Sequence, residues 1–143
     1  MSELLNVNSA LTEWEHKIIG KGLLFPKSVN VSIGSLNISE GFDRINQSIK
    51  LILNTPIGSR IGNRKFGSTL SECVFEDITE ITKQMIRMSV NDALRDWEPR
   101  INVSEVTFVD DDELTDSNIL GLVISYSLKD SDLSGNYVHF VVK

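Results

Sequence analysis

The hydrophobic pattern of the chain changes its period at Pro99, and this change constrains the fold more than any other feature. Before Pro99, apolar residues recur at three- and four-residue steps, as on one face of a helix. After it, they alternate with polar residues, as along a half-buried strand. Proline lacks a backbone N–H and ends a helix. Helices followed by an antiparallel sheet are therefore expected, which is an α+β architecture.

Two main helices are predicted. The first begins after an N-cap at Ser39 and ends at Thr55-Pro56, because the residue before proline avoids the helical region. The second begins at the capping box Asp77-x-x-Glu80 and ends at Trp97, and a brief helix starts at a similar box, Thr69-x-x-Glu72. The second helix is expected to bury one broad apolar face, formed by Ile78, Ile81, Met85, Met88, Val90, Ala93, Leu94 and Trp97.

Four strands are predicted from alternating apolar and polar residues. The first covers residues 29–33, and the others cover residues 101–108, 120–128 and 137–142. A slip of the alternation at Ser104-Glu105 indicates a β-bulge. The last three strands are expected to form a small antiparallel meander against which the two helices pack. Residues 137–142 would be its open edge strand.

The 143 residues are expected to form a single domain, since a chain of this length buries a sizeable core without disulfides or metals. Residues 1–26 are interpreted as an N-terminal extension with a weak helical pattern at 11–18. Residues 27–98 are the helical part and residues 99–143 the C-terminal sheet.

The charge balance argues against a nucleic-acid partner. The chain has 14 Lys+Arg and 20 Asp+Glu, so its net charge is 14 − 20 = −6, which disfavours binding to a phosphate backbone. No basic leader and no long apolar run are present, so neither a signal peptide nor a membrane partner is expected. The protein is expected to stay where it is made.

No catalytic constellation stands out in the sequence. Cys73 is the single cysteine, and His16 and His139 are its only candidate bases, so we interpret all three as ordinary structural residues. A glycosidase needs two carboxylates across a cleft. Sequence spacing identifies no such pair here, and the acids Glu72, Glu76, Asp77 and Glu80 are better explained as helix caps and first-turn charges.

Metal and nucleotide sites are likewise not expected. The acidic residues between 110 and 116 lack the turn glycine and the final glutamate of a calcium loop, so they indicate a solvated connection. The sequence predicts no cofactor. The acidic cluster consists of Asp110, Asp111, Asp112, Glu113 and Asp116.

Residues 54–71, which we call the basic loop, contain three glycines and three cations but no acid, in a chain that is acidic overall. The loop lacks the Lys-Ser/Thr ending of a phosphate-binding P-loop. Its cations Arg60, Arg64 and Lys65 are suited to contact an acidic protein surface, since guanidinium groups pair with carboxylates. A loop that is merely solvated is an equally open interpretation.

The segment Trp97-Glu98-Pro99-Arg100-Ile101 predicts a rigid turn between helix and strand. In extended backbone, Glu98 and Arg100 would project to the same side. They would then form a fixed two-charge docking element. The alternative is a helix stop whose charges are incidental.

Four segments in order resemble the baseplate wedge, or sheath-initiator, proteins of contractile injection machines. They are residues 20–26 (Gly-Lys-Gly-Leu-Leu-Phe-Pro), residues 49–60 (Ile-x-x-Ile-Leu-Asn-Thr followed by Gly-x-Arg), residues 64–70 (Arg-Lys-Phe-Gly-Ser-x-Leu) and residues 97–101 with the signature Glu-Pro-Arg triplet. The chain departs from the family at Arg64-Lys65, where proline and an acid are usual.

The resemblance implies a structural role without catalysis in a phage tail, a tailocin, a type VI secretion system or an extracellular injection system. Six copies would surround the inner tube in each particle. Glu98, Pro99 and Arg100 would dock on the helical core bundle of the wedge. The resemblance also implies that the last strand nucleates the sheath by strand exchange with the first sheath ring. Its residues are Tyr137, Val138, His139, Phe140, Val141 and Val142.

Some family members carry lysozyme in their names. A peptidoglycan-degrading enzyme is therefore the alternative function that the resemblance leaves open. Because a shared fold does not establish chemistry, the choice depends on the residues of this chain.

Overall fold

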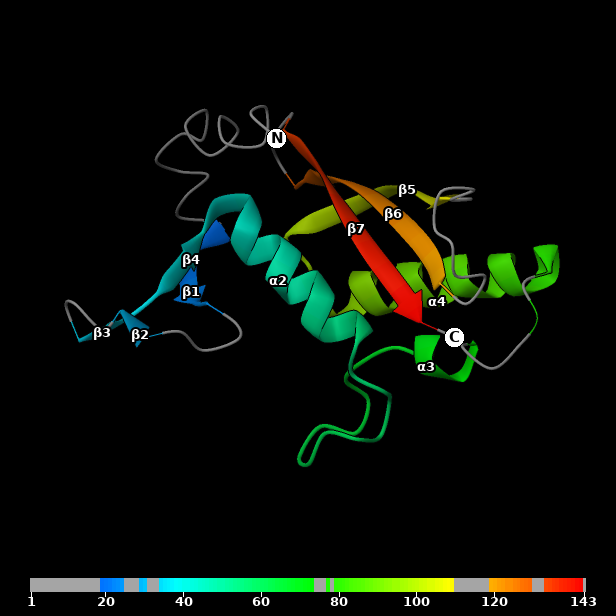
Figure 1. Cartoon of the computed structure of the whole chain (residues 1–143), viewed down its shortest axis with the longest axis horizontal. Coiled ribbons are helices and arrows are strands. Elements are labelled where there is room, and N and C mark those ends of the chain that lie inside the picture. Colours follow the sequence, from blue (N-terminus) through cyan, green and yellow to red (C-terminus); the bar gives the residue numbers. More distant parts are fainter. Residues whose placement is uncertain are drawn as a thin grey trace. The chain divides into compact units, whose positions relative to one another are not determined.

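The computed structural model describes residues 19–24, 29–30, 34–73, 77, 79–109, 119–129 and 133–142 (Figure 1). The chain divides into two compact units, residues 1–48 and 49–143. The expectation of a single domain stays a prediction. The weak helical pattern at 11–18 and the acidic cluster at 110–116 lie outside the described residues.

The first unit contains two short antiparallel strand pairs. β1 (Lys21–Leu23) pairs with β4 (Ile38–Glu40), and β2 (Val29–Asn30) pairs with β3 (Ser35–Leu36). β2 is the described part of the strand predicted at 29–33. Helix α2 (Gly41–Leu53) follows β4 directly and continues into the second unit.

The start predicted for α2 is wrong, whereas its end before Pro56 is confirmed. Ser39 is not an N-cap but part of β4, and its hydroxyl lies 3.3 Å from the carbonyl oxygen of Gly22 and 3.1 Å from Oε1 of Gln47. Pairing with β1 holds this segment extended. Gly41, whose φ of +61° suits glycine, then turns the chain into the helix.

The described residues of the second unit form two further helices and the three-stranded sheet. Its elements are α3 (Leu70–Cys73), α4 (Glu80–Trp97), β5 (Ile101–Val109), β6 (Ile119–Leu128) and β7 (Ser134–Val142). The strands form an antiparallel meander in the order β5-β6-β7, which confirms the predicted α+β class. No helix in the described part of the chain is long and apolar enough to span a membrane.

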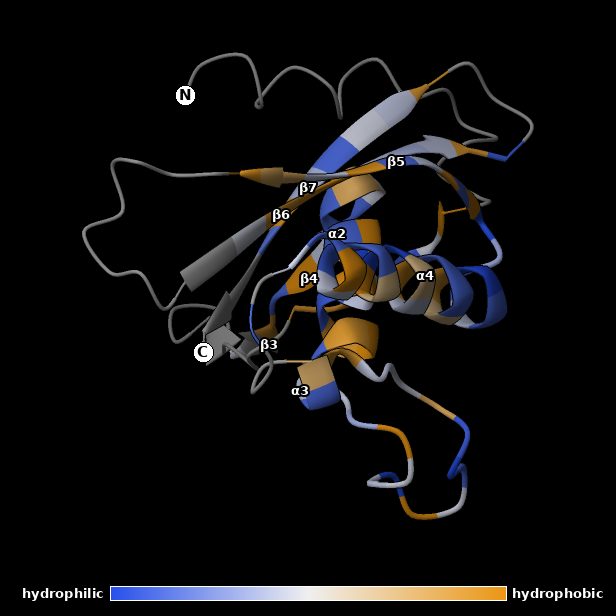
Figure 2. Cartoon of the chain, turned by 90° about the vertical axis from the view of Figure 1, so that its right-hand side faces the viewer, coloured by the Kyte–Doolittle hydropathy of each residue, from blue (hydrophilic) through white to orange (hydrophobic). Residues whose placement is uncertain are grey.

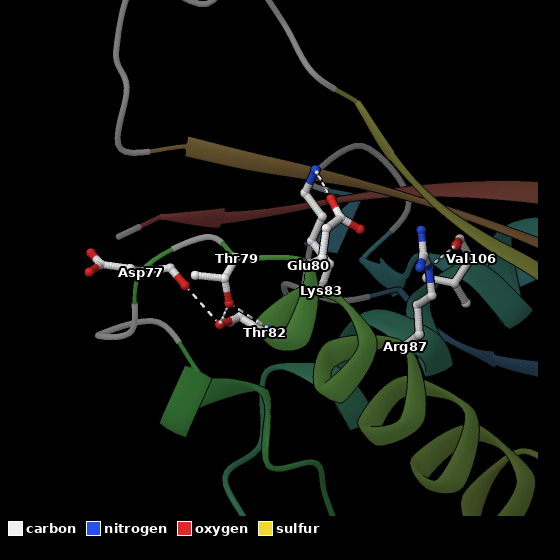
Figure 3. Close-up of polar contacts among 7 residues, drawn as sticks. All are labelled: Asp77, Thr79, Glu80, Thr82, Lys83, Arg87 and Val106. Carbon is white, nitrogen blue, oxygen red and sulfur yellow. Dashed lines mark hydrogen bonds and ion pairs between the residues drawn. The ribbon is translucent and has the colours of Figure 1, made fainter.

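Helix α4 lies against the sheet at β5 (Figures 1 and 2). The Arg87 Nε donates a hydrogen bond to the carbonyl oxygen of Val106 at 3.2 Å (Figure 3). The guanidinium carbon of Arg87 lies 4.8 Å from the centre of the Phe108 ring. The pairing of β5 with β6 shifts between Val103 and Glu105, so the predicted bulge is confirmed. From residue 122 onward, every second side chain of β6 is buried, namely Leu122, Ile124, Tyr126 and Leu128.

The N-cap predicted for α4 is two residues too early. Thr79 is the cap, and its Oγ1 accepts a hydrogen bond from the backbone N–H of Thr82 at 3.2 Å (Figure 3). Asp77 contributes its backbone carbonyl instead, which accepts from the Thr82 hydroxyl at 2.7 Å. Asp77 and Thr79 both have side chains that can cap a helix. The cap is Thr79, while the buried Thr82 hydroxyl bonds to the backbone of Asp77.

The apolar face predicted for α4 is only partly correct, and Ile78, its first member, lies outside the described residues. The buried stripe consists of Thr82, Ile86, Val90, Ala93 and Leu94. Three members of the predicted face are instead exposed, Ile81 by 74%, Met85 by 49% and Met88 by 60%. These three residues lie on the far side of the helix from the buried stripe, because they are offset from it by about half a turn.

Candidate functional site

We call Glu98, Pro99 and Arg100 the corner. Glu98 caps α4, with its N–H donating to the Leu94 carbonyl at 2.9 Å. The Arg100 carbonyl accepts a hydrogen bond from the N–H of Lys129 at 2.9 Å, which ties the corner to the end of β6. These bonds hold the backbone on both sides of Pro99, so the corner is rigid.

The two charges of the corner bind each other. The Arg100 Nε lies 2.5 Å from Oε1 of Glu98, and the Arg100 Nη2 lies 2.6 Å from Oε2, in a bidentate pair. Glu98 is only 2% exposed, whereas the Arg100 side chain is 23% exposed. A buried carboxylate requires such a partner. The corner therefore presents Pro99 and one edge of Arg100 outward, rather than two outward-facing charges.

A shallow cavity of about 260 Å³ lies beside the corner. Its lining includes Pro99, Ile101 and the cations Arg95 and Lys129. Arg95 binds Asp92 on the same helix, with a nitrogen–oxygen distance of 3.1 Å. The corner thus combines an exposed proline with a recess large enough for one side chain of a partner.

The basic loop is closed at its base by hydrogen bonds. The Ser68 hydroxyl donates to the Leu53 carbonyl at 2.8 Å, and the Ser68 N–H donates to the Thr55 carbonyl at 2.9 Å. Further out, the Gly58 N–H donates to the Arg64 carbonyl at 2.8 Å. Figure 1 shows the loop between α2 and α3 as two adjacent segments of chain that extend away from these helices. It has a defined backbone.

The basic loop also contacts the end of α4. The ring of Phe66 meets the ring of Trp97 edge to face, with centroids 5.2 Å apart. The Arg60 guanidinium carbon lies 4.5 Å from the centre of the Phe66 ring. Arg60, Phe66 and Trp97 therefore form one stack that ends directly before the corner. Sequence reasoning missed Phe66, although it lies in the quoted Arg-Lys-Phe-Gly-Ser segment.

The three cations of the basic loop, Arg60, Arg64 and Lys65, are all exposed. No carboxylate among the described residues forms an ion pair with any of them. Lys65 and Trp97 share the lining of a second shallow cavity, of about 190 Å³, with Asp92 and Asp96.

Strand β7 is an edge strand of the meander. It pairs with β6 from Ser134 to Val142, which starts three residues before the predicted 137–142. Val138 is 46% exposed and Tyr137 is half-buried, whereas His139 is 6% exposed. Phe140, Val141 and Val142 continue the strand backbone. No described segment pairs with the outer side of β7.

Burial changes the titration of two β7 side chains. Burial raises the pKa of the Tyr137 phenol. Burial also lowers the pKa of the His139 imidazole, and the nearby positive charge of Lys50 lowers it further. The buried His139 ring lies at a centroid distance of 6.0 Å from the Tyr137 ring.

The family model described as baseplate wedge protein gp25 matches residues 39–132, which include the basic loop and the corner. The chain belongs to this family. Family membership makes it a baseplate wedge component of phage-like contractile machinery. The matched region ends before β7. Baseplate protein W of Escherichia phage P2 is 36% identical over 77 residues, which are 50% of this chain and 67% of the phage protein.

Two solved structures share the fold. A protein of Geobacter sulfurreducens described as a tail lysozyme has a TM-score of 0.66 and 29% identity, over 76% of this chain and 96% of its own. A chain in the baseplate of the anti-feeding prophage has a TM-score of 0.61 over 86% of this chain and 85% of its own. At 18% identity, the second similarity concerns the fold alone.

Cys73 and Glu80, two of the other candidate residues of this wedge protein, make contacts that the structure describes. Cys73 is half-buried, and its sulfur lies 3.9 Å from the Thr69 carbonyl oxygen. Glu80 pairs with Lys83 at 3.3 Å, as a first-turn acid does. The described residues contain no group of three or more His, Cys, Asp or Glu side chains that could hold a metal ion. His16 and Glu76 lie outside the described ranges.

Proposed function

We propose that this wedge protein nucleates the sheath of a contractile particle, with six copies around the inner tube or hub. It assembles in the cytoplasm and remains in the baseplate of the finished particle. The observation that carries the proposal is the position of β7 at the edge of the meander. An edge strand offers a row of backbone N–H and C=O groups to a further strand.

Strand exchange with the first sheath ring would use residues 137–142. The nine-residue length of β7 offers a long ladder of main-chain bonds, and its alternating side chains define the register. Exposed Val138 would contribute an apolar contact on one face, while buried His139 anchors the strand on the other. A sheath strand would thus add to a strand that is already fixed along β6.

The corner would attach the protein to the helical core bundle of the wedge. The internal Glu98–Arg100 pair supports this proposal because it holds Pro99 in a fixed exposed position. The recess beside Pro99 would accept a side chain from a helix of the bundle. A preorganised contact of this kind loses little entropy on binding.

The role is structural, and we propose no catalytic, metal-binding or cofactor-binding residue. The relative described as a tail lysozyme keeps one rival open, a peptidoglycan-degrading enzyme. In the described part of the chain, Glu98 is bound by Arg100, and Asp92 and Asp96 both contact Arg95 on the outside of α4. Clearing of a peptidoglycan suspension by the purified chain would support the rival.

The proposal is tested by electron microscopy of particles from cells that produce the rest of the machine. Without this protein, we expect tubes or baseplates that lack sheath, and the wild-type chain should restore it. A chain that lacks residues 137–143 should still join baseplates but support no sheath. Fully sheathed particles in either case would contradict sheath initiation.

Variants of the corner test the proposed attachment to the core bundle. Arg100→Ala should reduce recovery of the chain in purified baseplates. Because that change also leaves Glu98 without its partner, Pro99→Glu is the cleaner variant, since it places a charge on the exposed residue alone. Normal recovery of Pro99→Glu would count against docking through the corner.

A further inference from the structure

The tip of the basic loop carries an apolar side chain that nothing in the described residues covers. Ile61 is 100% exposed, which is the highest value among the large apolar residues of the described chain. It lies between Arg60 and Arg64, both also exposed. Figure 2 shows hydrophobic and hydrophilic stretches alternating along this loop. An apolar residue surrounded by charges at a loop tip is typical of an anchor for a protein partner.

The loop holds this tip in a fixed place. Gly67, with φ +121°, allows Ser68 to close the base, and a Cβ at Gly67 would collide with the carbonyl oxygen of Thr55. Gly58 and Gly62 adopt φ of +88° on either side of the tip. A binding element whose conformation is already set pays less entropy when it docks.

The aromatic stack couples the tip to the corner. Arg60 covers Phe66, and Phe66 contacts Trp97, the residue directly before Glu98. A body that contacts the corner would therefore lie close to the loop as well. This continuity indicates that the loop and the corner face one assembly.

We propose that the basic loop is a second docking element, which inserts Ile61 into an apolar recess with an acidic rim on a neighbouring baseplate protein. The inference rests on the proposed docking through the corner and extends it. The chemistry of the partner follows from the loop. Arg60, Arg64 and Lys65 have no acid partner among the described residues, and bidentate guanidinium groups select carboxylates.

A protein partner fits this loop better than a nucleic acid. A phosphate backbone is bound by cations and hydrogen-bond donors, and it offers nothing to an isoleucine that projects beyond them. The net charge of −6 would also repel a polyanion outside the loop. An apolar recess with an acidic rim would contact Ile61 inside the recess and the loop cations at its rim.

The test replaces position 61 of the full chain in producing cells with a photo-crosslinking amino acid, and position 81 serves as the control. Ile81 is a matched site because it is also an isoleucine and 74% exposed, but lies on α4. We expect position 61 to give an adduct with a baseplate protein, at a peptide flanked by Asp or Glu. No adduct, an adduct with nucleic acid, or the same adduct from position 81 would overturn the inference.

The second measurement is the amount of chain recovered in purified baseplates. Ile61→Asp and the double variant Arg60→Glu/Arg64→Glu should each reduce it about tenfold, as expected for a hot-spot residue. Ile61→Leu should be recovered normally. Ile81→Asp controls for a charge on an exposed isoleucine, and an unchanged melting temperature shows that each variant folds.

The outcomes separate this inference from the proposal on which it rests. If Pro99→Glu reduces recovery and Ile61→Asp does not, docking through the corner stands and the loop inference is wrong. If Ile61→Asp alone reduces recovery, the loop docks and the corner does not. Normal recovery of both variants would reject both.

Discussion

The corner and the basic loop both carry exposed or partly exposed cations, but only the cation of the corner is paired with a carboxylate among the described residues. Arg100 has its carboxylate within the chain, bound through two nitrogen atoms, and that carboxylate is buried. Arg60, Arg64 and Lys65 are exposed, and none of them forms an ion pair with an acid among the described residues. A cation that is paired internally stabilises a shape, whereas an unpaired cation remains available to a partner.

Whether a charged side chain is paired within the chain indicates whether it is available to bind a partner. The sequence shows Glu98 and Arg100 two residues apart in an exposed-looking turn, which resembles a surface for recognition. Their mutual pairing makes them a support for Pro99 instead. The basic loop, for which the sequence leaves a protein contact and a solvated connection equally open, presents a fully exposed isoleucine between two arginines on a hydrogen-bonded backbone.

The largest expected effect comes from breaking the corner. Arg100→Ala leaves a buried carboxylate without its partner, which typically costs about 3–5 kcal/mol of unfolding free energy. Urea denaturation measures the loss. Arg95→Ala is the control, because it removes an exposed ion pair worth about 1 kcal/mol or less. Equal losses in the two variants would mean that the corner pair is no more structural than a surface pair.

Removing both charges of the corner tests whether the unpaired Glu98 carboxylate causes the loss of stability in Arg100→Ala. In the double variant Glu98→Met/Arg100→Met, both charges are removed together, so no buried ion is left behind. Buried pairs replaced by apolar side chains are often neutral in stability. We expect this variant to regain most of what Arg100→Ala loses. If it remains as unstable as the single variant, packing around Arg100 rather than the charge of Glu98 supports the corner.

The next largest loss of stability is expected from changes to the glycines that shape the backbone of the basic loop. Gly67→Ala combines a positive φ with a collision against the Thr55 carbonyl, so we expect a loss of more than about 2 kcal/mol. Gly58→Ala has a positive φ with no heavy atom within 4 Å of its Cβ, so it should lose only about 1–2 kcal/mol. Chemical denaturation compares the two. A loop without a fixed frame would tolerate both changes equally.

Local patterns predicted much of the fold from sequence. The slip at Ser104-Glu105 indicated a bulge because a strand with one buried face must keep its period of two. Pro56 and Pro99 marked helix ends through the backbone geometry of proline itself. Each of these features depends on residues within a few positions of it, and the structure confirms them.

The wrong predictions depend on contacts between distant residues. Ser39 has the right chemistry for an N-cap, but pairing between β1 and β4 keeps it in a strand. Ile81, Met85 and Met88 share a helical face, yet periodicity does not say which face of a helix meets the sheet. The contact between Phe66 and Trp97 joins residues 31 positions apart, a separation that no local pattern reaches.

The smallest expected effect measures how strongly the loop and the corner are joined. Phe66→Leu and Trp97→Leu each remove one ring of the edge-to-face pair, and the double variant removes both. A double-mutant cycle on unfolding free energy should give a coupling of about 0.5–1.5 kcal/mol, the usual range for such pairs. Additive losses would mean that the rings touch without mutual support. The loop and the corner would then be independent elements, and a partner could bind either without the other.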